Sequence, residues 1–428
     1  MNDKLQMVKA GAWCLVISSL LMADAARALL SISMILLALV LLYDSIVGKN
    51  HLSLSSTRML LFMALGFLLL YGVQFLYSEN KSYLWERIGI KLPFILLPLV
   101  ALRSSPISSK YMRFILLYYV ALMALVSLAM FVRYLLNKDA YDLLYAQSSV
   151  MPGPISHIRL SIMIAFAAYA AYYLLYIIRQ HSFRILLIGC LVLLIMFTHV
   201  YSVRSGLFAF YTLVVYELMC RILNTTHKGK FLAICASIAC IALAAAWFTP
   251  TIRNKISITV EELNQYAQGR NLNHNSIGKR LASYHIAIDI AKQNPLWGCG
   301  IGDYTDLNTS AFNQRHPEVE VPIIAHNQFL YYLAASGIFG VLLFLCFFFY
   351  PIVHIQRLPR LLAAQLLVLL VSFQTEPMLE TQLGVAYSVV FWLLPVCMQF
   401  EESSSGQSLR PFVYIHYFRP QYFYDKTC

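Results

Sequence analysis

The stretch FILLYYVALMALVSLAMFV at residues 114–132 decides the class of fold, because it contains no charged side chain. An α-helix needs about 20 mostly apolar residues to cross a hydrocarbon core about 30 Å thick, and this stretch has that length. Apolar runs with few or no charges recur along most of the 428 residues. The pattern predicts an all-α integral membrane protein that uses lipid as its solvent.

The composition supports this class. Hydrophobic residues make up 60% of the chain and charged residues 12%, whereas a soluble domain carries about 25% charged residues. A membrane β-barrel would instead show short segments of alternating polarity, which the sequence lacks. The first apolar run resembles a signal peptide, since Lys4 and Lys9 precede it. Because the next run begins at Ala28, we expect a retained N-terminus and a tight helical hairpin.

We expect about twelve transmembrane helices, near residues 11–22, 28–43, 59–77, 88–102, 113–136, 158–178, 184–199, 206–222, 231–249, 327–350, 361–375 and 383–399. An even number of spans puts both termini on one side. If that side is the cytoplasm, the inner segments hold most of the excess of Lys and Arg, which is the usual orientation. The net charge of +12 is then explained by Lys and Arg in the cytoplasmic segments, and nucleic acid is not an expected partner.

These spans divide the chain into four parts. Residues 1–249 hold the first nine helices, and residues 250–325 form a large helical periplasmic loop between helices 9 and 10. Residues 326–400 hold the last three helices, and residues 401–428 form a cytoplasmic tail. We interpret the tail as a peripheral segment at the lipid headgroups.

One helix of the loop is predicted at Ser276 to Gln293. Its apolar stripe consists of Ile277, Leu281, Tyr284, Ile288 and Ala291. Asn294-Pro295 should end this helix, and Gly298, Gly300 and Gly302 should form the turn that follows. Cys299 is the one cysteine of the loop, so an intraloop disulfide is excluded.

Three residues on the expected outer side have suitable chemistry for catalysis. Arg204 lies between spans seven and eight, where a charge is costly and tends to be functional, although an arginine can also extend to the interface. Arg280 lies in the first turns of the loop helix, where a solvated face is the alternative. His326 lies where the loop re-enters the membrane, and a histidine of ordinary pKa can act as a base near pH 7.

Further substrate-binding candidates lie on the same side. They are Arg87 and Lys91 on one helix face before Pro93, His157 and Arg159 at the start of span six, Tyr304 and Asn327, and Glu376 and Glu380 before span twelve. The paired charges among them can bind substrate or serve equally as interfacial charges. The sequence shows no phosphate-binding loop and no spacing typical of metal ligands, so we expect no cofactor and no metal site.

At His326 the sequence resembles the O-antigen ligase family. Its signature is His, then Asn, Ser or Gln, nine residues, Gly, two residues, and Gly, Thr or Tyr; His326-Asn327 and Gly337-Ile338-Phe339-Gly340 fit without mismatch. The family also has an arginine at a short outer loop, matched by Arg204, and one before a Pro-x-x-Gly-x-Gly-x-Gly turn, matched by Arg280. The resemblance covers roughly residues 10–400. We expect Gly337 and Gly340 only to pack helices closely.

The resemblance implies an activity in the bacterial inner membrane, with the active site facing the periplasm. Members of the family transfer a glycan from a polyprenyl-diphosphate carrier to the lipid A–core saccharide, so these two lipids and the surrounding membrane are the expected partners. Arginines suit the diphosphate leaving group, since they donate bidentate, charge-assisted hydrogen bonds. A neutral His326 would accept the proton of the attacking hydroxyl, and a single displacement would invert the anomeric carbon.

Several alternatives stay open at this point. An O-antigen polymerase shares the topology and the donor and differs in its acceptor, and a protein O-oligosaccharyltransferase belongs to the same superfamily. Metal-dependent membrane glycosyltransferases have a long, acidic first outer loop, which is only Ala23 to Arg27 here. A transporter of lipid-linked glycan is the non-enzyme alternative; the sequence shows no inverted repeat, but Pro93 and Pro98 interrupt span four.

Overall fold

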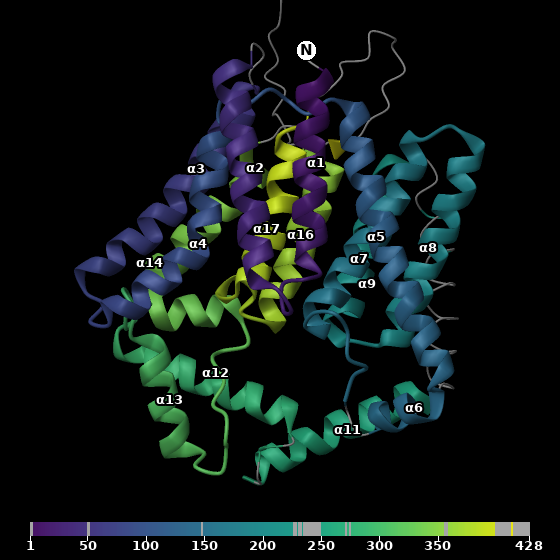
Figure 1. Ribbon diagram of the computed structural model, residues 1–428. Coiled ribbons are helices and arrows are strands. Elements are labelled where there is room, and N and C mark those ends of the chain that lie inside the picture. Colours follow the sequence, from purple (N-terminus) through teal and green to yellow (C-terminus); the bar gives the residue numbers. More distant parts are fainter. Residues whose placement is uncertain are drawn as a thin grey trace, which may run out of the picture.

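A computed structural model of the chain is almost entirely helical (Figure 1). It describes residues 3–48, 52–146, 149–225, 229, 233, 250–269, 272–273, 275–354, 358–398 and 412–413. The predicted ninth span, residues 231–249, and nearly all of the predicted tail lie outside these described residues. The other eleven predicted spans each coincide with a described helix.

The described helices before α11 and after α13 are α1 (Asp3–Leu20), α2 (Arg27–Val47), α3 (Leu54–Gly72), η1 (Val73–Leu76), α4 (Lys81–Ala101), α5 (Ser109–Leu136), α6 (Lys138–Ala146), α7 (His157–Ile177), α8 (His181–Tyr201), α9 (Arg204–Asn224), α14 (Gln328–Phe348), α15 (Tyr350–His354), α16 (Arg360–Thr375), η2 (Met378–Glu380) and α17 (Gln382–Val396). Three helices lie between α9 and α14 in sequence: α11 (Pro250–Ala267), α12 (Ser276–Gln293) and α13 (Tyr304–Arg315). Two short strands, β1 (Leu358–Pro359) and β2 (Phe412–Val413), pair antiparallel.

Seven of the described helical segments are long and apolar enough to cross a membrane. They are α2, α3 with η1, α5, α7, α8, α9 and α14, and α16 and α17 are shorter apolar helices. This number confirms a multi-pass membrane protein. The total of twelve spans and their orientation stay predictions.

The helices form a bundle with a layer of further helices at one end (Figure 1). The N-terminus lies at the end opposite to α11, α12 and α13, which lie across the bundle. Helices α7 and α17 are buried on nearly all sides, whereas α8 exposes several large apolar side chains, among them Phe183, Ile185 and Leu186. A helix that is apolar all round suits the centre, and the exposed face of α8 suits lipid. The three helices confirm that the segment after residue 250 is helical.

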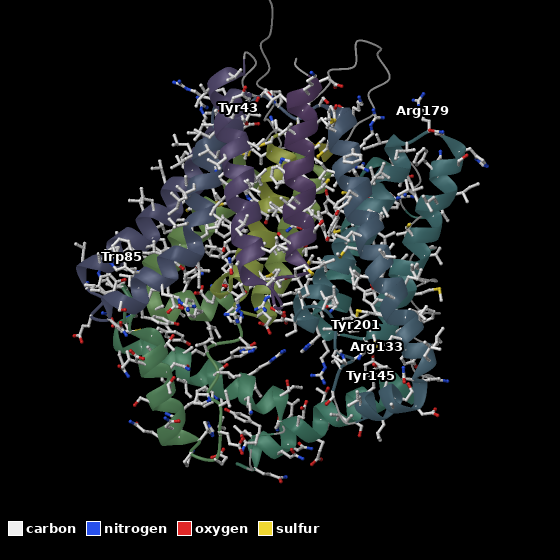
Figure 2. The ribbon with its side chains drawn as sticks, viewed as in Figure 1. Tyr43, Trp85, Arg133, Tyr145, Arg179 and Tyr201 are labelled. Carbon is white, nitrogen blue, oxygen red and sulfur yellow. The ribbon has the colours of Figure 1, made fainter. Side chains whose placement is uncertain are left out.

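Exposed aromatic residues mark the two ends of the bundle (Figure 2). Tyr43 lies near the end that carries the N-terminus, and Trp85 lies toward the opposite end. Both side chains are mostly exposed. Aromatic residues gather at the two membrane–water interfaces, because their rings are amphipathic. Their positions agree with a membrane between the two ends.

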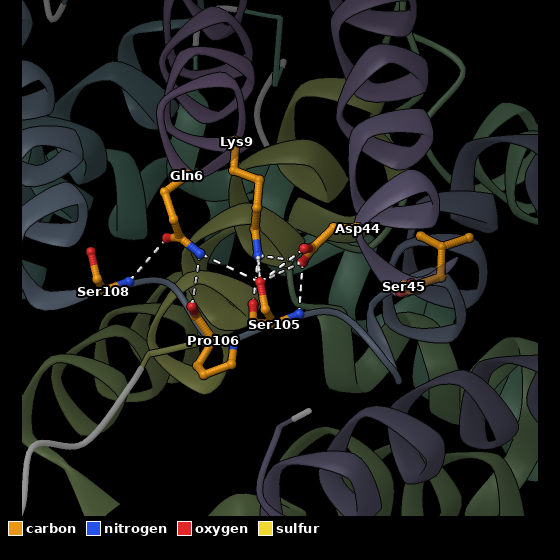
Figure 3. A network of polar contacts seen from close by, with 8 residues as sticks. Gln6, Lys9, Asp44, Ser45, Ser105, Pro106 and Ser108 are labelled. Carbon is orange, nitrogen blue, oxygen red and sulfur yellow. Dashed lines mark hydrogen bonds and ion pairs between the residues drawn. The ribbon is translucent and has the colours of Figure 1, made fainter. Parts of the chain in front are cut away.

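A buried ion pair closes the N-terminal end of the bundle (Figure 3). Lys9 Nζ of α1 lies 2.6 Å from Asp44 Oδ2 of α2, and both side chains are almost completely buried. Ser105 donates its backbone N–H to Asp44 at 2.7 Å, and its carbonyl accepts a hydrogen bond from Lys9. Buried charges are tolerated when they are paired and hydrogen-bonded. The network therefore ties α1 and α2 to the connection between α4 and α5.

Helix α4 runs from Lys81 to Ala101 through both Pro93 and Pro98. The prediction that these prolines interrupt the fourth span is therefore wrong. Neighbouring helices can satisfy the backbone groups that a proline frees in a membrane helix. Pro93 and Pro98 therefore no longer support the transporter alternative, which needed a discontinuous helix at this span.

Helix α12 has the predicted bounds, and Asn275 caps its start by accepting a hydrogen bond from Gly278 N at 2.6 Å. The predicted apolar stripe is wrong in detail. Of its five members only Ala291 is buried, while the other four are half-buried. The buried face instead consists of Gly278, Ala282, Ser283, Ile286, Ala287, Ile290 and Ala291. Small residues let α12 pack closely against α14, which the large apolar side chains would not.

Helix α14 is kinked at Gly337, which has φ 66° and ψ −171°. The turn after α12 docks on this kink through backbone hydrogen bonds: Cys299 N to Ala334 O and Gly300 N to Ala335 O, both at 2.9 Å, Ile338 N to Pro295 O at 2.9 Å, and Phe339 N to Leu296 O at 3.3 Å. A Cβ on Gly337 would lie 2.2 Å from Leu296 O. The expectation that Gly337 only packs helices is therefore wrong: it lets a turn bind the backbone of α14.

The turn itself has the predicted glycine geometry, with positive φ at Gly298 and Gly300. A second clamp comes from the η1–α4 connection. Asp303 accepts the backbone N–H groups of Glu79 at 2.8 Å and Asn80 at 2.7 Å. The path from α12 to α13 is thus fixed both to α14 and to the start of α4, which places α12 firmly over the end of the bundle.

Candidate active site

The structure brings Arg204 and Arg280 to the same pocket, although 75 residues lie between them in the sequence. The pocket lies between the first residues of α7 and α9 on one side and helices α11 and α12 on the other. It is lined by Tyr145, Ser149, Val150, His157, Ile158, Ser202, Val203, Arg204, Ser205, Ile258, Glu262, Ser276, Arg280 and Thr375. Two guanidinium groups facing one cavity can bind a doubly charged anion such as a diphosphate.

Arg204 is the first residue of α9, and the tight α8–α9 corner holds it at the pocket. Ser202 adopts the left-handed conformation, with φ 57°, and lets the chain reverse. Two residues after Arg204, Gly206 lies so close to α7 that a Cβ there would be 2.4 Å from Ser161 Cβ. The corner is therefore pressed against α7, and the start of α9 is fixed in place.

The Arg204 guanidinium contacts α11. Its Nη2 donates to Thr259 Oγ1 at 3.1 Å and lies 3.9 Å from Glu262 Oε2. The other Glu262 oxygen accepts the backbone N–H of Ser276, the first residue of α12, at 3.1 Å. Thr259 and Glu262 were missed by sequence reasoning, because the packing of α11 against the α9 corner has no signature in the chain.

Arg280 projects from the second turn of α12 beside Tyr284. Burial raises the pKa of the Tyr284 hydroxyl, and the Arg280 charge opposes that shift. The same hydroxyl donates to the His326 carbonyl at 2.9 Å. Helix α12 therefore carries an arginine that lines the pocket and, one turn later, a tyrosine that holds the backbone of the histidine segment.

The His326 ring is oriented by its own chain. Nδ1 lies 3.0 Å from the Ile324 carbonyl oxygen. A carbonyl can only accept, so Nδ1 carries the hydrogen and the Nε2 lone pair of the neutral ring is free to take a proton. Nε2 faces Glu376, with 3.7 Å to Oε1. The half-buried ring thus has the tautomer that a general base needs.

Asn327 is the N-cap of α14. Its side-chain oxygen accepts the backbone N–H groups of Phe329 at 2.9 Å and Leu330 at 3.1 Å. Its Nδ2 donates to Gln374, near the end of α16, at 3.3 Å. An N-cap needs a short polar side chain, which explains the residue that follows the histidine in the signature. The contacts favour a role in fixing the helix start.

Arg159 and His157, at the start of α7, are brought to the same region. The Arg159 guanidinium lies 4.0 Å from Glu376 Oε2, and His157 lines the pocket. Thr375, the residue before Glu376, also lines it. The pocket of the two arginines and the His326–Glu376 pair are therefore neighbouring parts of one region.

Arg87, Lys91, Glu380 and Tyr304 make contacts that favour structural roles. Lys91 is fully buried 3.0 Å from Glu380 Oε1, which also accepts from Gln328 Nε2 at 3.0 Å. Arg87 donates to the Glu380 carbonyl at 3.2 Å. The buried Tyr304 hydroxyl accepts the Ala325 N–H at 3.2 Å, and burial raises its pKa. These four candidates tie α4, α13 and α14 together behind the site.

No group of three or more His, Cys, Asp or Glu side chains that could hold a metal ion occurs among the described residues. The charged groups in and beside the pocket are three arginines, Arg204, Arg280 and Arg159, and two carboxylates, Glu262 and Glu376. The chemistry of the arginines suits a phosphorylated ligand.

A family model described as O-antigen ligase matches residues 154–345. This match supports the resemblance predicted from the signature, and its range contains Arg204, Arg280 and His326 but neither Arg87 nor Glu376. The search of curated proteins gave no match.

Proposed function

We propose that this member of the O-antigen ligase family transfers a glycan from a polyprenyl-diphosphate carrier to the lipid A–core saccharide. The reaction takes place on the periplasmic face of the bacterial inner membrane, and residues 250–325 form the extramembrane layer over the site. The observation that carries the proposal is the pocket that Arg204 and Arg280 share, next to a histidine whose Nε2 is free to accept a proton.

Arg204 and Arg280 hold the diphosphate of the donor. When the glycan leaves, the bond between its anomeric carbon and the phosphate oxygen breaks, and the diphosphate takes the electron pair. Two guanidinium groups stabilise this charge through bidentate hydrogen bonds, and they do so most strongly as it develops in the transition state. No divalent ion is required for that neutralisation.

His326 activates the acceptor. The sugar hydroxyl attacks the anomeric carbon from the side opposite to the diphosphate, and its proton moves to Nε2. The new glycosidic bond forms as the bond to phosphate breaks, so the configuration inverts. The Ile324 carbonyl keeps Nδ1 protonated during this step, and Tyr284 fixes the backbone of His326 from α12.

Substitution of the three residues in the purified, full-length protein tests this division of roles. Arg204→Ala and Arg280→Ala should each lose about 10²–10³-fold in rate, as removal of an oxyanion donor does. Arg280→Lys should also be impaired, because lysine cannot form the bidentate fork. His326→Ala should bind donor normally and lose about 10²–10⁴-fold in transfer.

Lys279→Ala is the matched control for Arg280→Ala, since Lys279 precedes it on α12 and does not line the pocket. Its rate should equal that of the parent, and all variants must reach the membrane at parent levels. Normal turnover in His326→Ala would remove the base assignment. Loss of donor binding in that variant would instead move His326 to the diphosphate site.

The acceptor is tested in cells. A strain lacking the gene should make lipopolysaccharide with bare core and accumulate carrier-linked polymer. Core that carries a single repeat would assign the chain to polymerases, and unchanged lipopolysaccharide with altered glycoproteins would assign it to protein O-oligosaccharyltransferases. Carrier-linked glycan confined to the cytoplasmic leaflet would indicate a transporter.

A further inference from the structure

Glu376 directly follows the last residue of α16 and lies between His326 and Arg159. Its Oε1 lies 3.7 Å from His326 Nε2, and its Oε2 lies 4.0 Å from Arg159 Nη2. The carboxylate is only 11% exposed. The backbone N–H of Glu376 donates to Ser372 O at 3.0 Å, so the α16 helix fixes its position.

The separation of 3.7 Å is too long for a direct hydrogen bond, but it leaves Nε2 and the carboxylate facing the same space. In the neutral ring, Nε2 carries a lone pair, because Nδ1 donates to Ile324. Once Nε2 has taken the acceptor's proton, the ring is positively charged and lies within 4 Å of the Glu376 carboxylate. An opposite charge at this distance favours the charged form of the ring.

We infer that Glu376 is a positioning residue of the transfer step, whose carboxylate stabilises the imidazolium formed on His326. The inference rests on the proposed function, since it needs His326 to be the base. Glu376 acts through His326 and takes no part in bond making. Its charge is most useful in the transition state, when the hydroxyl proton moves from oxygen to Nε2 and the diphosphate departs with its electron pair.

The other charged and titratable groups around His326 come from two helices. Helix α7 contributes His157 and Arg159, and α12 contributes Arg280 and Tyr284. Arg159 and Arg280 are cationic, so they oppose a positive charge on the His326 ring. Among the described residues, Glu376 is the acid placed within 4 Å of Nε2. Arg159 Nη2 lies 4.0 Å from its second oxygen, so the carboxylate lies between Arg159 and the histidine.

Glu380 provides an internal comparison, because it is a second buried carboxylate only four residues later. It pairs with Lys91 and Gln328, away from His326. Replacing it should affect how α4, η2 and α14 are held together. The two positions therefore separate an effect on the histidine from the general effect of removing a buried acid.

The experiment uses the purified, full-length protein. Carrier-linked glycan and bare-core lipopolysaccharide, both extracted from a strain lacking the gene, serve as donor and acceptor. The variants are Glu376→Gln, Glu376→Asp and Glu380→Gln, with His326→Ala as the reference. The readouts are kcat and donor KM from pH 5 to pH 9, corrected for the amount of folded protein.

Glu376→Gln should lower kcat about 10- to 100-fold, because the uncharged amide cannot offset the positive charge that develops on the ring, and an interaction with a charged group is worth about that factor. Donor KM should stay within about twofold, because Glu376 does not touch the diphosphate. The loss of kcat should be present from pH 5 to pH 9, whereas Glu380→Gln should match the parent profile. Glu376→Asp keeps the charge and should recover part of kcat.

Two outcomes overturn the inference. In the first, Glu376→Gln retains the parent kcat and pH profile while His326→Ala is inactive; the proposed function then stands and this inference alone fails. In the second, Glu376→Gln yields less folded protein but has the parent kcat and profile per folded molecule, as Glu380→Gln should, and Glu376 is then structural. If His326→Ala is as active as the parent, the base assignment of the proposed function itself has failed.

Discussion

Substitution of Gly337 by alanine is the sharpest structural test of the site, because it touches none of the proposed catalytic residues. Gly337 combines φ 66° with ψ −171°, a region that only glycine adopts readily. An added Cβ would lie 2.2 Å from Leu296 O and 2.5 Å from Trp297 N. Both atoms are backbone atoms of the docked turn, so they cannot move aside as the end of a flexible side chain can.

The cost of Gly337→Ala follows from these contacts. The strained conformation costs about 1–3 kcal/mol if the turn stays in place. If the turn detaches instead, the strain is relieved but its four backbone hydrogen bonds to α14 are lost, each worth about 0.5–1.5 kcal/mol. Detachment therefore costs about 2–6 kcal/mol. Because this turn leads from α12, Arg280 and Tyr284 should lose their positions.

Thermal unfolding of the purified protein in detergent and transfer activity provide the assay. Gly337→Ala should unfold at a lower temperature, be cut faster by protease between residues 294 and 303, and lose most of its activity. Gly189→Ala in α8 is the matched control, since a Cβ there meets no atom within 4 Å, and it should be neutral or slightly stabilising. If Gly337→Ala unfolds, resists protease and turns over like the parent, the docked kink is not needed and this reasoning is refuted.

Three further predictions follow. Lys9→Met should destabilise the protein by about 3–5 kcal/mol, because it leaves Asp44 buried and unpaired; in thermal unfolding, Lys9→Met with Asp44→Asn should be more stable than Lys9→Met alone. Burial, with a smaller contribution from Asp303, raises the pKa of Cys299 to about 12. An impermeant maleimide applied to spheroplasts should therefore label it more slowly than an exposed thiol from Gln314→Cys, and its rate should rise about tenfold per unit between pH 7 and pH 9. Transfer should persist in excess EDTA, whereas activity lost there and restored by Mg²⁺ or Mn²⁺ would revive a metal-dependent mechanism.

Much of the fold could be predicted because lipid imposes a strong pattern on the sequence. Runs of apolar residues coincide with described helices, and α12 has the predicted ends because Asn275 caps it and Asn294-Pro295 stops it. The buried face of α12 could not be predicted in the same way. A periodicity analysis weights large apolar side chains, whereas close packing on α14 selects small ones such as Ala282 and Ala287.

The candidate site was only partly predictable. The chemistry of Arg204, Arg280 and His326 drew attention to them, and the structure brings the two arginines to one pocket. Glu262 and Thr259 were missed, because their contacts with Arg204 depend on how α11 lies against the α9 corner. Buried pairs such as Lys91 and Glu380 carry the same residue types as a binding site, so sequence alone could not separate the two.

The spacing within the signature can be understood from the geometry of α14. Asn327 caps the helix and fixes His326 one residue before it, while Gly337 lies ten residues after Asn327, at about 15 Å along the axis. At that point the kink receives the turn that comes from α12. The signature therefore contains both the histidine and the glycine kink on which the turn after α12 docks. Helix α12 is the helix that carries Arg280. Inserting one residue between Asn327 and Gly337 would rotate the kink by about 100° around the helix and turn it away from the docked segment. The fixed spacing thus sets the distance and the rotation about the helix axis between two parts of the proposed active site.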